Sequence, residues 1–346
     1  MRPAMVNGVE HVKQPRLGEF DIIARYFAPL ATTSASLGLR DDAAILPVPA
    51  GEELVATCDT IVEGVHFLSD DPPASIGHKV LAVNLSDLAA KGAAPHAYLL
   101  SLSLREAAPD WLEGFALGLG TLQASSGIAL IGGDTTATPG PVTIGITALG
   151  LVPKGKAVLR SGAKPGDRLY VSCTIGDAHL GLRLRQDPRL AEVWELTPQE
   201  AALLIERYQQ PEPRSRIALL LRQWAHAAID VSDGLVGDIE KLCMASCAGA
   251  IIDADRVPLA SAARKALARD KRLFEALITG GDDYEIVAAI PEGSAATFEA
   301  GALERQVSVT AIGKIVAGDP QVTVLDREGR ALKLAHKGFA HFEDSA

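Results

Sequence analysis

Aspartates stand in five short segments of this 346-residue chain, each close behind an apolar stretch, and in four of the five they are next to glycine or a hydroxyl residue. The five segments are Asp41-Asp42, Cys58-Asp59-Thr60, Gly132-Gly133-Asp134-Thr135, Asp230-Val231-Ser232-Asp233-Gly234 and Gly280-Gly281-Asp282-Asp283. Any one of them is typical of a turn or a helix cap, and capping the next helix could be the whole role of Asp233. As a set they indicate more, because neighbouring carboxylates repel one another unless cations lie between them. Mg²⁺ is the natural cation, since it prefers oxygen ligands and usually shares them with substrate phosphates.

The glycines of these segments favour the same chemistry, because glycine-rich turns let backbone N–H groups approach phosphate oxygens. Standard nucleotide motifs do not explain the set. The stretch Gly150 to Lys156 nearly matches a P-loop, but Ala157 lacks the required hydroxyl and Pro153 lies inside the loop. No G-x-G-x-x-G opens a strand-helix-strand unit, and neither a G-x-S-x-G elbow nor a protein-kinase signature occurs in the sequence.

Strand and helix patterns alternate along the chain around these segments. This alternation predicts an α/β (α+β) fold. Helices are predicted over 18–30, 72–92 and 111–125, and strands over 54–57, 128–131, 141–150, 168–172, 227–231, 284–290, 310–316 and 321–325. A further helix is expected to begin at Thr197, which is followed by Pro198 and, at the third position, Glu200. Within 72–92, Asp87 shares one polar stripe with Asn84 and Lys91, and so joins the acidic set. Strand ends bind ligands along one edge of an open sheet, so the acids are expected to meet there.

Composition bounds the domains and the partners. The segment 154–166 is rich in Gly, Lys and Pro, so we expect a domain boundary there, with domains over 18–153 and 154–346. The residues before them, 1–17, are expected to form a flexible tail. The chain has 33 Lys and Arg against 43 Asp and Glu, and its net charge of -10 disfavours nucleic acid and anionic membranes as partners. No apolar run reaches the roughly 18 residues of a membrane span, and the first residues lack a signal-peptide core. Four cysteines without zinc-site spacing predict reduced thiols and a cytoplasmic location.

Longer motifs resemble bacterial thiamine-monophosphate kinase, in the family's order, from about Gly18 to Phe342. The motifs that carry the resemblance are Gly18-Glu19-Phe20, Asp41-Asp42-Ala43, Cys58-Asp59-Thr60, Glu63-Gly64-Val65-His66-Phe67, Asn84-Leu85-Ser86-Asp87-Leu88-Ala89, Gly132-Gly133-Asp134-Thr135, Arg160-Ser161-Gly162-Ala163, Asp230-Val231-Ser232-Asp233-Gly234-Leu235, Gly281-Asp282-Asp283-Tyr284-Glu285 and Lys337-Gly338-Phe339-Ala340-His341-Phe342. The resemblance implies the two-domain fold shared with aminoimidazole ribonucleotide synthetase. In that fold the N-terminal domain binds ATP and Mg²⁺ and pairs with its twin in a homodimer, and a C-terminal α/β domain packs against it.

The resemblance also implies a reaction, the phosphorylation of thiamine monophosphate by ATP to give thiamine diphosphate, the last step of the synthesis of that cofactor. Matching positions for several Mg²⁺ ions are Asp41, Thr57, Cys58, Asp59, Asp87, Asp134, Asp230 and Asp233. Matching positions for ATP are Gly133, Asp134, Arg160 and Ser232, and those for thiamine monophosphate are His66, Asp282 and Phe339. No residue is expected to act as a covalent nucleophile or general base, because the attacking phosphate oxygen is already ionised.

Two positions depart from the family pattern. Arg40 stands where glycine is usual before the first aspartate pair, and Cys58 stands where Thr or Ser is usual, so only its backbone carbonyl would serve Mg²⁺ well. Neither change removes a carboxylate, so activity is still expected. The alternatives are another ATP-using enzyme of the same fold, resembling selenophosphate synthetase or the hydrogenase-maturation protein, and a non-catalytic regulator that binds Mg²⁺ and nucleotide. The segment 1–17 lacks the cysteine that selenium chemistry would need.

Overall fold

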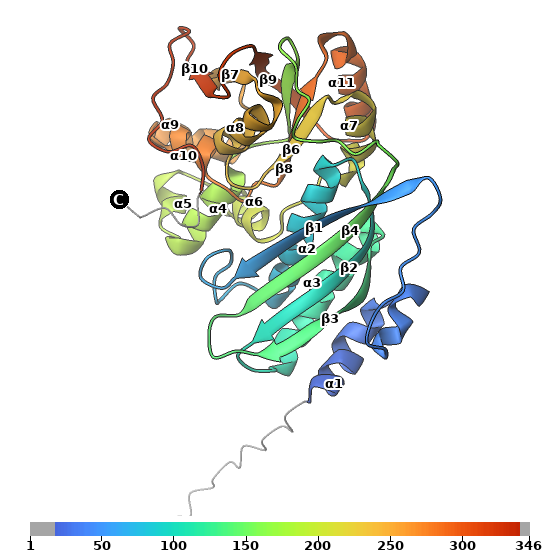
Figure 1. Cartoon of the computed structure of the whole chain (residues 1–346). Helices are drawn as coiled ribbons and strands as arrows, with labels where there is room; N and C mark the ends of the chain where they lie inside the picture. Colours follow the sequence, from blue (N-terminus) through green and yellow to red (C-terminus); the bar gives the residue numbers. More distant parts are fainter. Residues whose placement is uncertain (1–17, 340–346) are drawn as a thin grey trace, which may run out of the picture.

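The computed structural model describes residues 18–339 and contains two β-sheets, one in each half of the chain (Figure 1). The first sheet has the strand order β1-β4-β2-β3, with β1 over Glu52–Val62, β2 over Ala94–Leu104, β3 over Ala129–Ala137 and β4 over Thr143–Pro153. Two long helices, α2 (Pro73–Ala90) and α3 (Pro109–Ser126), cover one of its faces. Leu54 and Leu99 are exposed on the other face, which stays open within the described chain.

The second sheet has six strands in the order β10-β7-β9-β5-β8-β6. Its strands are β5 (Arg168–Ser172), β6 (Ala227–Val231), β7 (Gly249–Asp253), β8 (Glu285–Ile290), β9 (Val309–Val316) and β10 (Val322–Leu325). One group of helices packs on one face: α4 (Asp177–Gln186), α6 (Pro198–Gln209), α8 (Leu235–Ser246), α9 (Ser261–Arg269) and α10 (Leu273–Thr279). A second apolar cluster joins the sheet to α7 (Ala218–Trp224) and α11 (Ala295–Glu304).

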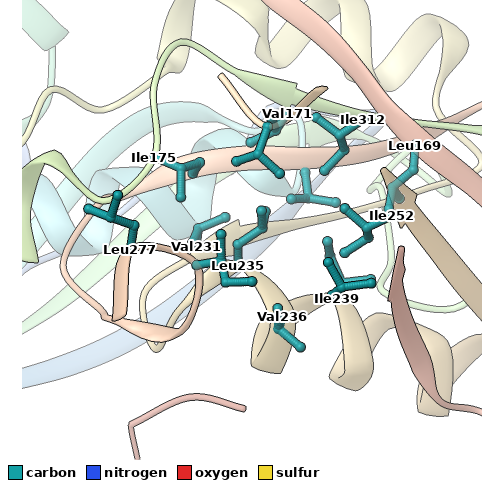
Figure 2. Packing of buried hydrophobic residues seen from close by; sticks show 14 of the residues in the cluster. Leu169, Val171, Ile175, Val231, Leu235, Val236, Ile239, Ile252, Leu277 and Ile312 are labelled. Carbon is teal, nitrogen blue, oxygen red and sulfur yellow. The ribbon is translucent and has the colours of Figure 1, made fainter. Parts of the chain in front are cut away.

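Apolar packing therefore buries the second sheet on both faces. In the cluster shown in Figure 2, Val171 and Ile312 of neighbouring strands lie against a core that includes Leu235 and Ile239 of α8. Every residue of β6 and β8 is buried. A strand that is buried on both faces presents nothing to solvent except at its ends, so polar groups of this sheet that serve a site must lie at the ends of its strands.

Helix α2 lies between the two sheets and contacts β1 and β4 of the first as well as β6 and β8 of the second. Its polar stripe faces β1. The buried side chain of Asn84 accepts the Asp59 N–H at 3.1 Å, and Asp87 accepts the Thr57 hydroxyl at 2.5 Å. The helix thus brings its own acid, Asp87, to both sheets. None of the helices in residues 18–339 is long and apolar enough to cross a membrane.

Several predicted elements are confirmed residue by residue. Strands predicted over 168–172 and 227–231 are β5 and β6. Helix α6 begins as expected, because Thr197 Oγ1 accepts the Glu200 N–H at 3.2 Å and Glu200 accepts the Thr197 N–H at 2.9 Å. The segment predicted as a helix over 18–30 is helical but changes type, with α1 over Glu19–Ile22, a π-helical turn over Ile23–Phe27 and a 3₁₀ turn over Ala28–Leu30.

Two predicted strand ends are wrong. Strand β1 continues through Cys58, Asp59 and Thr60, and β3 continues through Gly133 and Asp134, so these motifs lie within strands. Glycine in β3 reflects a close approach rather than a turn, since a Cβ on Gly133 would lie 1.9 Å from the Leu100 carbonyl oxygen. Both aspartates are thus carried by strands of the first sheet rather than by turns.

Candidate active site

A cavity of about 640 Å³ lies between the two domains. Residues of β1, α2 and the 63–67 segment form one wall, and the turns after β6 and before β8 form the other. The predicted site residues that line the cavity are Asp59, His66, Asp87, Arg160, Asp230, Ser232, Asp233, Asp282 and Phe339. The structure thus brings together nine side chains that are spread over 280 positions of the sequence, from 59 to 339.

The acidic end of the cavity consists of Asp59, Asp87, Asp230 and Asp233. Burial, followed by the charge of Asp87 and a hydrogen bond with it, raises the pKa of Asp59 to about 6. The pKa of Asp230, which is almost fully buried, is also raised, first by burial and then by the charge of Asp87. Asp59 and Asp230 are therefore costly to ionise, which is the electrostatic environment that a bound cation relieves.

The acidic end fits Mg²⁺ as a shared ion rather than as an ion held by protein alone. Within residues 18–339, no group of three or more His, Cys, Asp or Glu side chains is arranged to hold a metal ion by itself. Mg²⁺ commonly takes one or two carboxylates and fills its octahedron with water and substrate phosphate oxygens. Carboxylates that line a cavity from two domains suit that mode of binding.

The turn 232–234 is held by Asp238, a residue that the sequence analysis missed. Its Oδ2 accepts three backbone N–H groups, from Ser232 at 2.9 Å, Asp233 at 2.9 Å and Gly234 at 3.2 Å. These N–H groups are therefore used within the protein, which corrects the expectation that this turn presents them to phosphate. The signal in the sequence was the aspartate four residues after Gly234, in the first turn of the following helix.

The alternative in which Asp233 only caps the next helix is wrong. Helix α8 has Gly234 as its N-cap residue, with no side-chain hydrogen bond to the cap. The Asp233 carboxylate forms an ion pair with Lys241, which also donates to Asp238 Oδ1 at 2.7 Å. Asp233 is thus oriented by a cation from within α8 and faces the cavity.

Two cations stand beside the acids. Arg160 lines the cavity, and its charge lowers the pKa of Asp59 against the larger effect of burial. Lys91, the last residue of the polar stripe on α2, donates to the Ala228 carbonyl at 3.1 Å. Burial, and then the nearby charge of Arg160, lowers the pKa of Lys91 to about 8. The acidic end therefore offers positive as well as negative groups to a phosphate chain.

A second group of residues in the same lining has a different character, and we call it the substrate end: His66, Asp282 and Phe339. His66 Nδ1 accepts the Val62 N–H at 3.1 Å, which leaves Nε2 as the N–H donor of the neutral ring. Phe339 is about half exposed, and its backbone N–H donates to the Asp233 carbonyl at 2.8 Å. An imidazole donor, a carboxylate acceptor and an aromatic face suit an aromatic ligand that carries hydrogen-bonding groups.

Asp282 is held in an unusual backbone conformation. Its φ is 75°, in the left-handed region, and Tyr284 follows at 51°. Between them the buried Asp283 accepts the N–H groups of Gly176 at 2.7 Å and Ala178 at 3.3 Å. The 280–284 turn is therefore fixed by the start of α4, and its conformation directs Asp282 toward the cavity while Asp283 points the other way, into the protein.

Four of the other predicted residues lie elsewhere. Asp41 is exposed before β1, and neither it nor Asp134 lines the cavity. Asp134 and Gly133 lie on β3, the edge strand opposite β1, and Asp134 is in register with Ser101 of the open face. The width of the sheet, roughly 14 Å at about 4.8 Å per strand, separates β3 from β1. The Cys58 side chain is on the open face too, where its sulfur accepts the Thr147 hydroxyl at 3.4 Å.

Comparison with known proteins identifies the family of this chain. The family model described as AIR synthase related protein, N-terminal domain, matches residues 40–152, and that of the C-terminal domain matches residues 164–325. The two domains are thus those of an AIR synthase related protein. A thiamine-monophosphate kinase of Caulobacter vibrioides is 43% identical over 306 residues, which are 87% of this chain and 85% of the relative. The chain belongs to the thiamine-monophosphate kinase family, and the predicted fold class is confirmed.

Solved structures agree with this placement. The crystal structure of thiamine-monophosphate kinase from Stenotrophomonas maltophilia K279a has a TM-score of 0.79 and 41% identity, and the match covers 88% of this chain and 94% of that one. The structure of AaThiL complexed with AMPPCP and TMP has a TM-score of 0.74 and 28% identity, covering 95% of this chain and 100% of that one. Both matches therefore extend over most of this chain and nearly all of each solved chain.

Proposed function

We propose that the cavity is an active site in which the γ-phosphoryl group of ATP is transferred to thiamine monophosphate, giving ADP and thiamine diphosphate. The observation that carries the proposal is one cavity that is lined both by a cluster of carboxylates and by imidazole, carboxylate and aromatic groups. A relative of this fold is complexed with AMPPCP and TMP, so the two ligand classes occur together in one such protein. The reaction belongs to the last step of thiamine diphosphate synthesis.

Mg²⁺, as several ions, is proposed to bind at the acidic end through Asp59, Asp87 and Asp230. Burial and mutual repulsion raise the pKa of Asp59 and Asp230, and a divalent cation would favour their ionised forms. Thr57, which contacts Asp87, and the backbone carbonyl of Cys58 complete this proposed set on β1. When bound, the metal supplies charge neutralisation for the phosphates of both substrates.

Arg160 and Ser232 are proposed to contact the phosphate chain of ATP. A guanidinium group binds phosphate oxygens in bidentate geometry, and Arg160 is exposed at the acidic end. The backbone N–H groups of the 232–234 turn are already paired with Asp238, so the hydroxyl of Ser232 is the group that this turn offers. Phosphate recognition is thus assigned to side chains rather than to a backbone nest.

The chemical step asks the protein for alignment rather than for proton transfer. The attacking atom is a phosphate oxygen that is ionised at neutral pH, so no general base is needed. Because both groups of residues line one cavity, the acceptor and the donor phosphates would be bound next to each other, which favours their alignment for transfer. Arg160 adds positive charge where negative charge accumulates during transfer.

Thiamine monophosphate is proposed to occupy the end with His66, Asp282 and Phe339. The His66 Nε2–H donates a hydrogen bond to the ligand, and the Asp282 carboxylate accepts one. Phe339 presents a ring face on which the cationic ring of thiamine can stack. Packing at the end of the chain is the competing explanation for Phe339, and its place in the cavity lining favours the ligand contact.

A homodimer through the open face of the first sheet is also proposed. The face exposes Leu54 and Leu99 beside Cys58, an apolar surface unusual for a sheet that faces water. Asp134 points to this side of β3 and does not line the cavity of its own chain. We therefore propose that Asp134 binds metal and ATP, and Gly133 binds ATP, together with residues of a second copy of the chain. Sedimentation equilibrium measures the mass: a single-chain mass at micromolar concentration would contradict the dimer.

We place the protein in the cytoplasm, as an enzyme that meets small phosphate esters rather than nucleic acid. Its four cysteines form no disulfide, as expected for a reducing compartment. The net charge of -10 opposes non-specific binding to polyanions, and small phosphate esters reach the site through Mg²⁺.

Asp41 remains a proposed metal ligand, which would require its exposed segment to move toward the cavity.

The test is a direct assay with purified protein, ATP, Mg²⁺ and thiamine monophosphate, in which thiamine diphosphate is measured by chromatography. The expected result is formation of thiamine diphosphate and ADP in equal amounts, which depends on all three additions. ATP binding without product would favour the non-catalytic regulator. Turnover of ATP with a different acceptor would favour another enzyme of this fold, such as one that uses selenide or the hydrogenase-maturation type.

A further inference from the structure

Lys79 is an almost fully buried lysine between the two domains, and the proposed reaction gives it no role. Only 1% of its surface is exposed. Its Nζ donates to the His66 carbonyl at 2.8 Å, faces Asp282 Oδ2 at 3.3 Å and lies 3.9 Å from the centroid of the Tyr208 ring. Lysine is rarely buried without such partners, because removal of its ammonium group from water is costly.

The partners of Lys79 belong to three separate parts of the chain. His66 follows β1 in the first domain, Asp282 lies in the turn before β8, and Tyr208 lies on α6. The Tyr208 hydroxyl donates to the same His66 carbonyl at 3.4 Å. One ammonium group therefore ties the first-domain wall of the cavity to the second-domain wall at the substrate end.

Lys79 itself does not line the cavity, whereas His66 and Asp282 do. It acts on Asp282 from behind, through Oδ2, while the Tyr284 hydroxyl donates to Oδ1 at 3.3 Å. Asp282 also has a left-handed backbone, so its position is costly and must be secured by contacts. Without the ammonium group, the carboxylate would lose the cation that orients and neutralises it.

We propose that Lys79 is a positioning residue for thiamine monophosphate, which fixes the Asp282 carboxylate in the geometry that binds this substrate, while the His66 carbonyl and the Tyr208 ring hold its ammonium group in place. The inference rests on the proposed function of the cavity. It predicts an effect confined to one substrate, because Lys79 contacts the substrate end and none of the residues assigned to ATP. A merely structural role would instead weaken both substrates together.

The first test is Lys79→Met, which keeps the length of the side chain and removes its charge. KM for thiamine monophosphate is expected to rise about tenfold or more, as for removal of one partner of a buried charge pair. KM for ATP is expected to stay within about twofold. The control is Arg222→Met, since Arg222 also crosses the domain boundary, to the Gly92 carbonyl at 3.2 Å, away from the cavity. Equal changes in both KM values, or none, would overturn the proposal.

The second test combines Lys79→Met with Asp282→Asn, which removes the carboxylate left without its cation and so protects folding. If Lys79 works through Asp282, the double variant has the same KM for thiamine monophosphate as Asp282→Asn alone, within about twofold. Effects that multiply would show that Lys79 acts independently, against the proposal. This comparison decides the matter even where Lys79→Met alone does not fold.

Failure of the proposed function has a separate signature. If the native protein yields no thiamine diphosphate, calorimetric binding of thiamine monophosphate and of ATP replaces KM. Selectively weaker binding of thiamine monophosphate by Lys79→Met then supports the positioning role without the reaction. Absence of any thiamine monophosphate binding by the native protein overturns both.

Discussion

The two ends of the cavity differ in what neutralises their carboxylates. At the substrate end, Asp282 has a cation supplied by the protein, Lys79 Nζ at 3.3 Å. At the acidic end, Asp59 and Asp230 face other carboxylates, and within the described chain neither forms an ion pair. Asp282 is therefore neutralised by the protein before any ligand arrives. Asp59 and Asp230 have no such partner, although Asp233 beside them pairs with Lys241, so a bound cation or a proton is needed to balance their charge.

The two ends are therefore expected to recognise their ligands in different ways. A carboxylate that is already paired and oriented recognises a ligand by hydrogen bonding and shape, and it does so without reorganisation. Carboxylates held near one another and partly protonated change their state when a metal ion arrives. The substrate end is thus set in advance, and the acidic end is completed by metal and nucleotide together. The predictions below test this contrast.

The largest effect is expected from Asp87→Asn, because Asp87 contacts Thr57 and raises the pKa of both Asp59 and Asp230. Turnover with saturating substrates and Mg²⁺ should fall about 100-fold or more, as for the loss of a preorganised charge contact. The melting temperature without metal should not fall, since the change removes repulsion. The matched control is Asp110→Asn, an exposed acid in the first turn of α3. Turnover within about threefold of native would remove the acidic end from the mechanism.

A smaller loss is expected from Asp238→Asn, which tests the support of the acidic end rather than its ligands. The amide keeps one acceptor oxygen, but it loses the charge that holds Lys241 and three backbone N–H groups. Activity or Mg²⁺ affinity should fall about 10- to 100-fold, as is typical for residues that orient metal ligands. The Mg²⁺ concentration for half-maximal activity is the measurement. An unchanged Mg²⁺ titration would mean that the turn holds its shape without Asp238.

The sequence predicted the acidic set well where local pattern decides geometry. The spacing of Asn84 and Asp87 on a helix brought Asp87 against β1 as expected, and the capping box at Thr197 formed as written. Asp134 is different, because its distance from Asp59 depends on the non-sequential strand order β1-β4-β2-β3. No local pattern encodes that order, so two similar motifs ended at opposite edges of one sheet.

Lys79 and Asp238 were missed for a related reason. Lys79 lies in a helix whose neighbouring residues are apolar, and its partners are near residues 66, 208 and 282, which only the assembled domains bring together. The available signal was the one Lys or Arg of α2, which is followed by the apolar run 80–83. Asp238 does not stand out in the sequence, because an acid in the first turn of a helix is common without any role in a site.

The dependence of stability on pH provides a thermodynamic test of the acidic end. The pKa of Asp59 is raised to about 6 in the folded protein, from 3.8, so the folded state binds a proton more tightly than the unfolded state. This group therefore costs stability as pH rises through about 4 to 6, and the cost is largest above 6. Asp59→Asn removes it, so without metal the variant should be more stable than native by about 2 kcal/mol at pH 7.5 and by much less at pH 4.

Mg²⁺ should reverse the order, because it stabilises the native carboxylate and finds a weaker ligand in the amide. Thermal melts of both proteins at the two pH values, with and without Mg²⁺, make the measurement. An identical difference in melting temperature at both pH values would mean that Asp59 titrates normally in the fold. The paired carboxylate at the other end of the cavity should show no such dependence on Mg²⁺.

The smallest effect is expected from Cys58→Ser, although the sequence alone marks Cys58 as a departure next to Asp59. Its side chain is on the open face, where Thr147 donates to the sulfur, and successive residues of a strand point to opposite faces. The Mg²⁺ concentration for half-maximal activity should therefore stay within about twofold of native, as for an ordinary surface substitution. A markedly lower Mg²⁺ concentration for half-maximal activity would instead show that the side chain at position 58 contacts the metal at the acidic end. Because only the backbone carbonyl of Cys58 is available to that end, the acidic end can tolerate this cysteine without loss of a ligand.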